Sequence, residues 1–309
     1  MVSRRFLRIK VLKEVYSFFI AHGDSPEAAR KTLEHSIRKT YDLYHLLLLL
    51  AEELGDYAQR LLEHGLQKNI PTAEELHPNS KFVDNEFVAL LRGNLPLRHY
   101  CEKQRLSWSG SPEVVKKLLA ALYASDFFQQ YMAAPDRSFA EDKALVIRLY
   151  NDLLEDFEPL LFALEEQSIY WTDDVEFTLS QIIKTLRQLR QGQSPDTPLM
   201  PLYRDDGDRL FAEKLLQRAI TCSDEYHQLI DRHIKNWDVE RVAFMDITIM
   251  TTAIAELVEF ANIPVKVSLN EYIEIAKYYS TPYSSIFING VLDRVVEDLK
   301  NSGLLNKIE

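Results

Sequence analysis

Apolar residues recur every three or four positions along most of the chain, which is the spacing of one buried face of an α-helix. Near the start, this spacing is kept by Leu7, Val11, Val15 and Phe18. These positions predict a first helix that ends near Gly23. Residues 24–27, Asp-Ser-Pro-Glu, combine a capping side chain with a proline, so a second and long helical stretch is expected from there to about residue 66.

Prolines divide the middle of the chain into shorter segments. The pattern predicts helices over residues 112–134, 139–167 and 175–191, with an interruption of the second at Pro159. Residues 192–208 are the richest stretch in proline, glycine and aspartate. We interpret them as a linker that leads to a last helical region.

Three further helical units are expected between residues 236 and 300. Pro264 should end the first, and Ser268 with Glu271 has the spacing of a capping box that opens the second. Ser284 or Ser285 could cap the third. Gly290 lies inside that third helix, where glycine costs about 1 kcal/mol relative to alanine. We therefore expect another backbone, most simply that of a crossing helix, to approach Gly290 closely.

Composition supports an all-α fold without a membrane span. Of 309 residues, 46% are hydrophobic, and nine glycines and twelve prolines leave few turns. The longest apolar run, residues 46–51, is far shorter than the ~20 residues that cross a bilayer. Cys101 and Cys222 lie far apart and fit neither a disulfide framework nor a zinc site. With no signal peptide in MVSRRFLRIK, a cytoplasmic protein is expected.

Charge is distributed unevenly over the chain, whose net charge is −11. Residues 1–22 hold five cations and one acid, whereas residues 23–205 hold 20 cations against 29 acids and residues 206–309 hold 11 against 17. Arg4, Arg5 and Arg8 stand at the start of the first helix, where the helix dipole favours anions. An anionic partner such as RNA phosphate explains this basic arm better than a solvated helix start does.

Motifs of common enzyme sites are missing from the sequence. No GxGxxG, GxxxxGK[ST], HExxH or GxSxG occurs, and the eight histidines are scattered. His227 and His233 are six residues apart, which does not place them on one helix face. The run at residues 205–208 lacks the rest of a calcium loop. The sequence therefore predicts no catalytic site, no cofactor and no metal.

The last hundred residues resemble the C-terminal half of the NusB family. The residues that carry the resemblance are Trp237, Arg241, Asp246, Ile249, Ala253, Glu256-Leu257, Ile263-Pro264, Lys266-Val267, Asn270-Glu271, Ala276-Lys277 and FINGVLD at 287–293. The start, SRRFLRIKVLKEVYSFF, is similar to the arginine-rich first helix of that family. The resemblance implies an all-α, NusB-like helical bundle with a large helical insertion after the first helix. Its domains would be residues 1–22, the insertion 23–205 and residues 206–309.

The resemblance also implies a function. NusB proteins bind the single-stranded boxA element of ribosomal RNA transcripts together with NusE, a small-subunit ribosomal protein, in the RNA polymerase antitermination complex. Such a site needs cations for phosphates and planar groups for unstacked bases. The expected RNA-binding residues are Arg4, Arg5, Arg8, Tyr16, Lys277, Tyr279, Tyr283, Ser284 and Phe287. Arg241 and Asp246 are expected at the protein partner.

Other interpretations stay open at this point. Tyr16 and Phe287 could equally be core residues. The family usually has basic residues where this chain has Ile247 and Thr251, and commonly an acidic one at Tyr283. One alternative function is a non-catalytic protein-interaction scaffold with little RNA affinity, whose working surface is the acidic insertion. Another is the RNA-targeting module of a ribosomal RNA methyltransferase, but that class needs a strand-rich, glycine-bearing cofactor domain.

Overall fold

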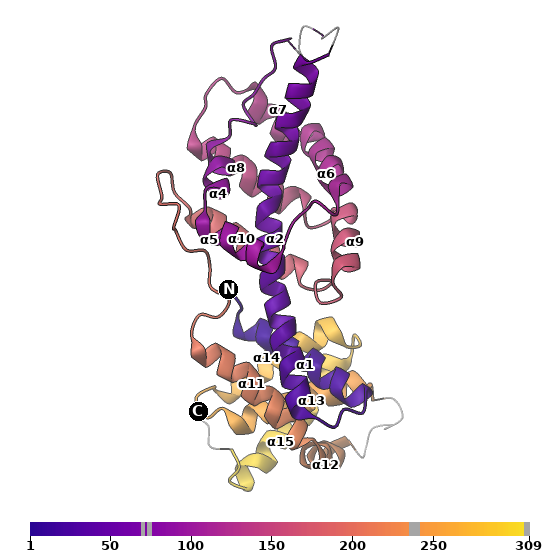
Figure 1. Ribbon diagram of the computed structural model, residues 1–309. Helices are drawn as coiled ribbons and strands as arrows, with labels where there is room; N and C mark the ends of the chain where they lie inside the picture. Colours follow the sequence, from indigo (N-terminus) through magenta and orange to yellow (C-terminus); the bar gives the residue numbers. More distant parts are fainter. Residues whose placement is uncertain (69–71, 73–75, 235–241, 306–309) are drawn as a thin grey trace. The chain divides into compact units, whose positions relative to one another are not determined.

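The computed structural model describes residues 1–68, 72, 76–234 and 242–305, and it is helical without strands over that part of the chain. The prediction of an all-α fold is confirmed. The contacts divide the chain into two compact units (Figure 1). The first unit comprises residues 1–37 and 202–309, and the second comprises residues 38–201.

The first unit is built around one helix that is buried on nearly all sides. Its elements are α1 (Arg4–Ile20), the start of α2 (Pro26–Leu66), α11 (Asp206–Thr221), α12 (Ser223–Ile234), α13 (Phe244–Glu259), α14 (Val265–Tyr279) and α15 (Ser284–Asn301). Helix α13 contacts α1, α11, α12, α14 and α15. Residues 248–257 are all buried, including three threonines and Glu256. Helix α13 therefore forms the centre to which the other helices of the unit attach.

The second unit surrounds the remainder of α2. Its other elements are α4 (Glu86–Arg92), α5 (Leu95–Gln104), α6 (Pro112–Ala124), α7 (Asp126–Ala133), α8 (Phe139–Arg148), a π-helical turn (Leu149–Leu153), α9 (Glu158–Gln167) and α10 (Val175–Gln188). Residues 42–52 of α2 are buried without interruption. Three aromatic side chains donate hydrogen bonds to α2 carbonyls: Trp108 to Leu46 at 2.8 Å, Tyr150 to Leu47 at 2.6 Å and Trp171 to Lys39 at 2.7 Å. The polar ends of these large side chains are thus satisfied inside the core.

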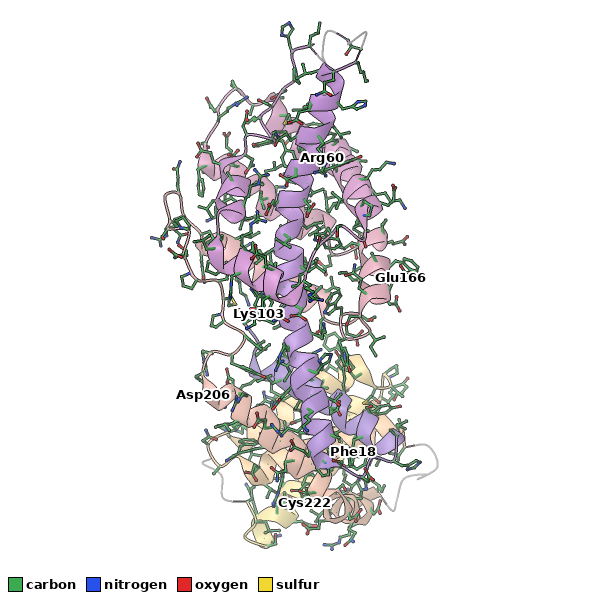
Figure 2. The ribbon with its side chains drawn as sticks, viewed as in Figure 1. Phe18, Arg60, Lys103, Glu166, Asp206 and Cys222 are labelled. Carbon is green, nitrogen blue, oxygen red and sulfur yellow. The ribbon has the colours of Figure 1, made fainter. Side chains whose placement is uncertain are left out.

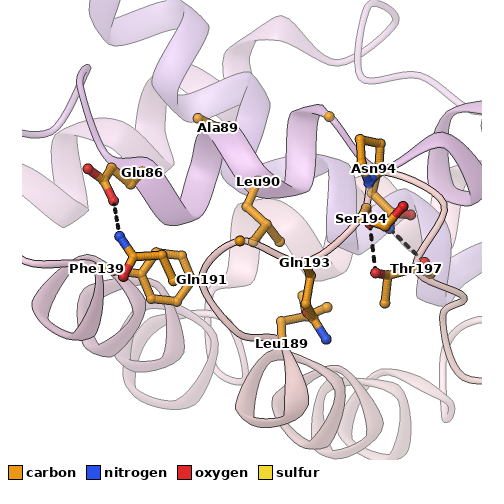
Figure 3. A pocket seen from close by; sticks show the side chains of 13 residues that line it. Glu86, Ala89, Leu90, Asn94, Phe139, Leu189, Gln191, Gln193, Ser194 and Thr197 are labelled. Carbon is orange, nitrogen blue, oxygen red and sulfur yellow. Dashed lines mark hydrogen bonds between the residues drawn. The ribbon is translucent and has the colours of Figure 1, made fainter.

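The linker predicted at residues 192–208 begins as an ordered loop against α4 and α5. Gln191 Nε2 donates to Glu86 at 2.9 Å, and Asn94 Nδ2 donates to the carbonyl of Thr197 at 2.8 Å (Figure 3). Between loop and helices lies a cavity of about 290 Å³, lined also by Phe139 of α8. The side-chain hydrogen bonds explain why this stretch is ordered although its composition is that of a loop.

Several local predictions are corrected by the structure. The helix expected over residues 112–134 is divided at Ser125, whose side chain caps α7. Pro159 does not interrupt a helix but stands in the first turn of α9, where its missing N–H costs nothing. Helix α14 begins at Val265, so Ser268 and Glu271 are not a capping box. A Cβ placed on Gly290 would meet no atom within 4 Å, so the close approach expected there was wrong.

Candidate nucleic-acid interface

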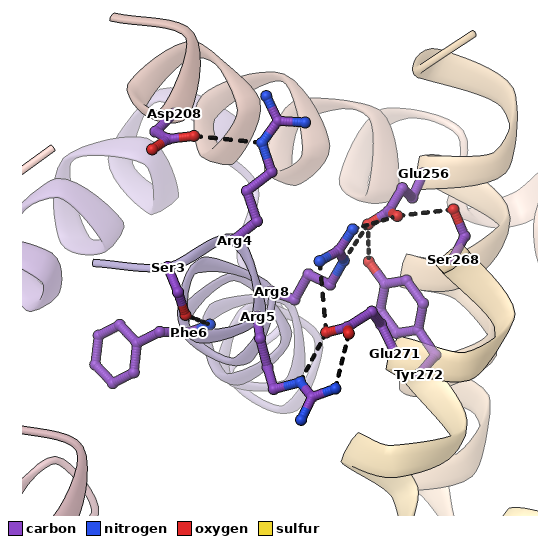
Figure 4. Close-up of polar contacts among 10 residues, drawn as sticks. All are labelled: Ser3, Arg4, Arg5, Phe6, Arg8, Asp208, Glu256, Ser268, Glu271 and Tyr272. Atoms are coloured by element: carbon purple, nitrogen blue, oxygen red, sulfur yellow. Dashed lines mark hydrogen bonds and ion pairs between the residues drawn. The ribbon is translucent and has the colours of Figure 1, made fainter. Parts of the chain in front are cut away.

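Arg8, predicted to contact phosphate, is buried in the first unit. Its guanidinium makes a double hydrogen bond to Glu256 of α13, with distances of 2.7 and 2.8 Å, and only 3% of the residue is exposed. Glu256 also accepts hydrogen bonds from Ser268 at 2.8 Å and from Tyr272 at 3.0 Å (Figure 4). The buried charges are therefore paired and their hydrogen bonds satisfied, as burial of an ion pair requires. Arg8 holds α1 to α13 and α14, and we leave it out of the interface proposed below.

Arg4 and Arg5 point to different sides of α1, so the three arginines do not form one patch (Figure 4). Arg4 Nε lies 3.3 Å from Asp208 of α11. Arg5 makes a double hydrogen bond to Glu271 of α14, both at 2.8 Å, and its side chain is 56% exposed. The hydrogen bond from Arg5 lowers the pKa of Glu271. Such an exposed pair contributes only about 0–1 kcal/mol, so exchanging Glu271 for a phosphate costs little.

Two aromatic residues predicted at the interface are Tyr16, which belongs to α1, and Tyr279, which lies in α14. The ammonium group of Lys13 stands over the ring of Tyr279, 5.3 Å from its centroid. The ring of Tyr16 packs at a tilt on Phe244, with 5.4 Å between centroids. Both Tyr16 and Tyr279 are half-buried, so each keeps part of its surface accessible. Lys13 was missed by sequence reasoning because its partner lies 266 positions further along the chain.

Other predicted residues hold the start of α15. Asp246 is buried and accepts hydrogen bonds from Ser280 and from Ser284, the latter at 2.9 Å. Phe287 is also buried, at 9% exposure. These contacts fix the turn between α14 and α15 against α13. The partner residue expected at Arg241 lies outside the described residues.

The turn between α14 and α15 presents exposed aromatic and apolar side chains. Tyr278, Tyr283 and Ile286 are 82%, 80% and 73% exposed. Lys277 is exposed beside them and pairs with Glu274 at 2.5 Å. Tyr283 was predicted here, whereas Tyr278 and Ile286 were missed. The helical period could have indicated Tyr278, because the buried positions of α14 include Tyr272, Ile275 and Ala276, which leaves Tyr278 on the outer face.

The described residues offer little that suggests a reactive centre. Among them, no group of three or more histidine, cysteine or acidic side chains could hold a metal ion. Cys101 and Cys222 are free, and burial raises the pKa of the Cys101 thiol to about 12. A thiol with such a pKa is a poor nucleophile at neutral pH. None of the helices described is both long and apolar enough to span a bilayer.

The first unit is all-α and carries cations and aromatic side chains around its first helix. These are the kinds of group with which proteins bind single-stranded nucleic acid. Comparison with known proteins identifies the family to which the chain belongs. The model of the NusB family matches residues 178–297. The protein belongs to the NusB family, which confirms the predicted resemblance. No solved structure matches the chain significantly.

Each of these relatives matches about a third of this chain. A transcription antitermination protein NusB from Salinibacter ruber is 43% identical over 108 residues, which are 35% of this chain and 68% of the relative. Proteins of the same name from Chloroherpeton thalassium and Gloeobacter violaceus are 41% and 39% identical, over 31% and 36% of this chain and 46% and 53% of their own lengths. The family match starts within α10, although the structural boundary of the first unit falls at residue 202. We assign α10 to the second unit, because it contacts α8 and the π-helical turn.

Proposed function

We propose that the protein is a transcription antitermination factor that binds the boxA element of ribosomal RNA transcripts together with NusE, in the RNA polymerase antitermination complex. The observation that carries the proposal is membership of the NusB family, whose relatives bear the name transcription antitermination protein. The geometry of the first unit supports it by supplying groups suited to single-stranded RNA. It requires no catalytic residue and no cofactor.

The proposed RNA site is the α1–α14 surface, which we define as Arg5, Lys13, Tyr16, Lys277, Tyr279 and Tyr283. Arg5 contacts Glu271 and Lys13 contacts Tyr279, so side chains of α1 and α14 meet along this surface. Arg5 and Lys277 are exposed and Lys13 is half-buried. Cations can neutralise phosphates, and each base stacked on an aromatic ring gains ~1–3 kcal/mol. Tyr283, at 80% exposure, has most of its ring free for stacking.

The NusE contact is proposed near the start of α13. Asp246 is buried there and accepts from Ser280 and Ser284. Its role would be to hold the turn that presents Tyr283, rather than to meet the partner directly. Phe287 and Ser284, both buried, would act in the same indirect way on the RNA side.

Titration of labelled boxA RNA, measured by fluorescence anisotropy at several salt concentrations, tests the proposal. We expect tighter binding of boxA than of a scrambled RNA, a gain on adding NusE, and a salt slope of about −0.7 per neutralised phosphate. Arg5→Gln with Lys13→Gln should flatten that slope. Lys116→Gln with Lys117→Gln, an equal charge change on exposed positions of the second unit, should leave it unchanged.

One observation favours the alternative of a scaffold with little RNA affinity. All three arginines at the start of α1 have carboxylate partners inside the chain. If that pairing satisfies them fully, boxA and scrambled RNA will bind equally weakly at every salt concentration, with or without NusE. That result would reject the boxA proposal and leave the scaffold.

A further inference from the structure

The second unit contains a long segment without any basic residue. Between residues 149 and 183 there are nine acidic side chains and no lysine, arginine or histidine. The whole second unit, residues 38–201, holds 17 cations against 25 acids. Its cations therefore lie elsewhere, and this segment has no positive charge of its own.

Helix α9 forms the outer part of that segment. Its inner positions Leu160, Ala163 and Leu164 are buried, and the helix packs on α6. Figure 1 shows α9 at the edge of the second unit beside α6. The opposite positions are exposed, and in Figure 2 Glu166 points away from the helices of its unit.

The exposed positions of α9 mix acidic and apolar side chains. We define the α9 face as Glu158, Phe162, Glu165, Glu166 and Ile169. Phe162 follows Glu158 by four residues, and Glu165 and Glu166 follow Phe162 by three and four, so these positions share one side of the helix. Ile169 follows just after the end of the helix. Phe162 is 63% exposed and Ile169 is 80% exposed. Large apolar side chains in such positions are typical of a surface that meets another protein.

The acidic side chains of this face are not compensated within the chain. Among the described residues, Glu158, Glu165 and Glu166 form no ion pair and no side-chain hydrogen bond. Glu165 and Glu166 stand in the last turn of α9, where the helix dipole favours cations and disfavours carboxylates. The face therefore combines exposed apolar area with unpaired acids at a helix C-terminus. A partner that carries both cations and apolar groups would pair the acids and cover the apolar area.

We propose that the α9 face docks a lysine- or arginine-rich protein segment that also carries apolar side chains. The partner's cations would face Glu158, Glu165 and Glu166, and its apolar groups would cover Phe162 and Ile169. The charge excludes RNA and anionic lipid as favoured occupants, since both are repelled by the unpaired carboxylates. A second copy of this chain is also disfavoured, because each copy carries a net charge of −11.

This proposal does not depend on boxA binding. Residues 158–169 lie outside the family match at 178–297 and in the unit that does not contain the α1–α14 surface. Variants of the α9 face should therefore leave the boxA titration unchanged. Failure of one proposal is then visible separately from failure of the other.

The test uses the full chain and a fluorescent lysine–leucine peptide with leucines at helical spacing. Phe162→Ser should weaken peptide binding about tenfold, as expected for losing one buried aromatic contact. Glu165→Gln with Glu166→Gln should weaken it about threefold to fivefold and reduce its salt dependence. A lysine–serine peptide of equal charge should bind more weakly than the lysine–leucine peptide.

Matched controls separate this face from general acidity. Leu95→Ser removes another exposed apolar side chain of the second unit, and Glu63→Gln with Glu102→Gln removes two other exposed charges. These controls should bind the peptide as the unmodified chain does, and thermal unfolding should show that all variants fold. Equal losses for controls and α9 variants would overturn the proposal. The proposal would also be overturned if the protein bound single-stranded RNA through this face, or formed a dimer in solution, and Phe162→Ser abolished that binding or that dimer.

Discussion

Replacing Glu256 with glutamine removes the charge that neutralises Arg8 while keeping nearly the same side-chain volume. Arg8 is 3% exposed and Glu256 is fully buried, so water cannot replace the lost carboxylate. Removing one partner of a buried ion pair costs about 3–5 kcal/mol, because the other charge stays buried without that partner. Glu271 lies 3.6 Å from Arg8 and remains as a second, more distant carboxylate, so we expect a loss at the lower end of this range. Against a typical unfolding free energy of about 5–15 kcal/mol, this is a large fraction. The midpoint of thermal unfolding of the first unit should fall by on the order of 10 °C.

A comparison of variants shows whether the loss comes from the buried charge. Arg8→Met combined with Glu256→Leu should be less destabilised than Glu256→Gln alone, since no unpaired charge remains. It should not recover fully, because Ser268 and Tyr272 lose the acceptor that they share. Glu271→Gln removes the carboxylate that pairs with the exposed Arg5 and lies 3.6 Å from Arg8. It should cost less than Glu256→Gln, because Arg8 keeps its double hydrogen bond to Glu256.

Circular dichroism followed during thermal and urea unfolding measures these differences. The two units could unfold separately, so the transition assigned to the first unit is the one compared. If Glu256→Gln costs no more than Glu271→Gln, Arg8 does not hold α1 in the way described. Retained boxA affinity in the double variant would further show that Arg8 acts on the fold and not on RNA.

Three other changes have definite expected outcomes. Burial raises the pKa of Glu14 from 4.5 to about 7, so stability falls as pH rises through that range. Glu14→Gln should therefore raise the free energy of unfolding by about 1–2 kcal/mol at pH 8, as measured by urea unfolding, and should leave it unchanged at pH 4. This gain is roughly half of the energy that corresponds to the full pKa shift, because Glu14 is partly solvated. Burial lowers the pKa of His45 from 6.5 to about 4, so the second unit should lose up to about 3 kcal/mol as pH falls through this range, and His45→Gln should flatten that loss. Gly290→Ala should raise the thermal midpoint through a gain of about 1 kcal/mol, because the added Cβ meets open space, and a lower midpoint would contradict that geometry.

Much of the fold could be predicted from spacing alone. The helical period located α1, α10 and α15, and the unbroken apolar run at residues 46–51 marked the most buried part of α2. Helix ends were harder. Ser268 and Glu271 matched a capping box by spacing, but Ser268 instead donates to Glu256 and Glu271 pairs with Arg5. A capping box predicted from local spacing does not form when its side chains make stronger contacts with distant helices.

The candidate site shows even more clearly that sequence spacing does not reveal contacts between distant helices. The sequence marked the start of α1 as unusual, since Arg4 and Arg5 oppose the helix dipole in its first turn and Arg8 follows in the next. It could not show that these cations face Asp208, Glu256 and Glu271, which lie more than 200 positions away in sequence. Charge clusters in sequence become one surface only if the helix directs them to one side, and α1 does not.

Read-through of a terminator in a transcription assay shows directly whether the protein acts as an antitermination factor. A template with boxA upstream of a terminator is transcribed by RNA polymerase with NusE and the other antitermination factors, with and without this protein. We predict that the protein increases read-through on this template and not on one with a scrambled boxA, and that Arg5→Gln with Lys13→Gln reduces the increase. Read-through that is equal on both templates, or unchanged by the protein, would contradict it.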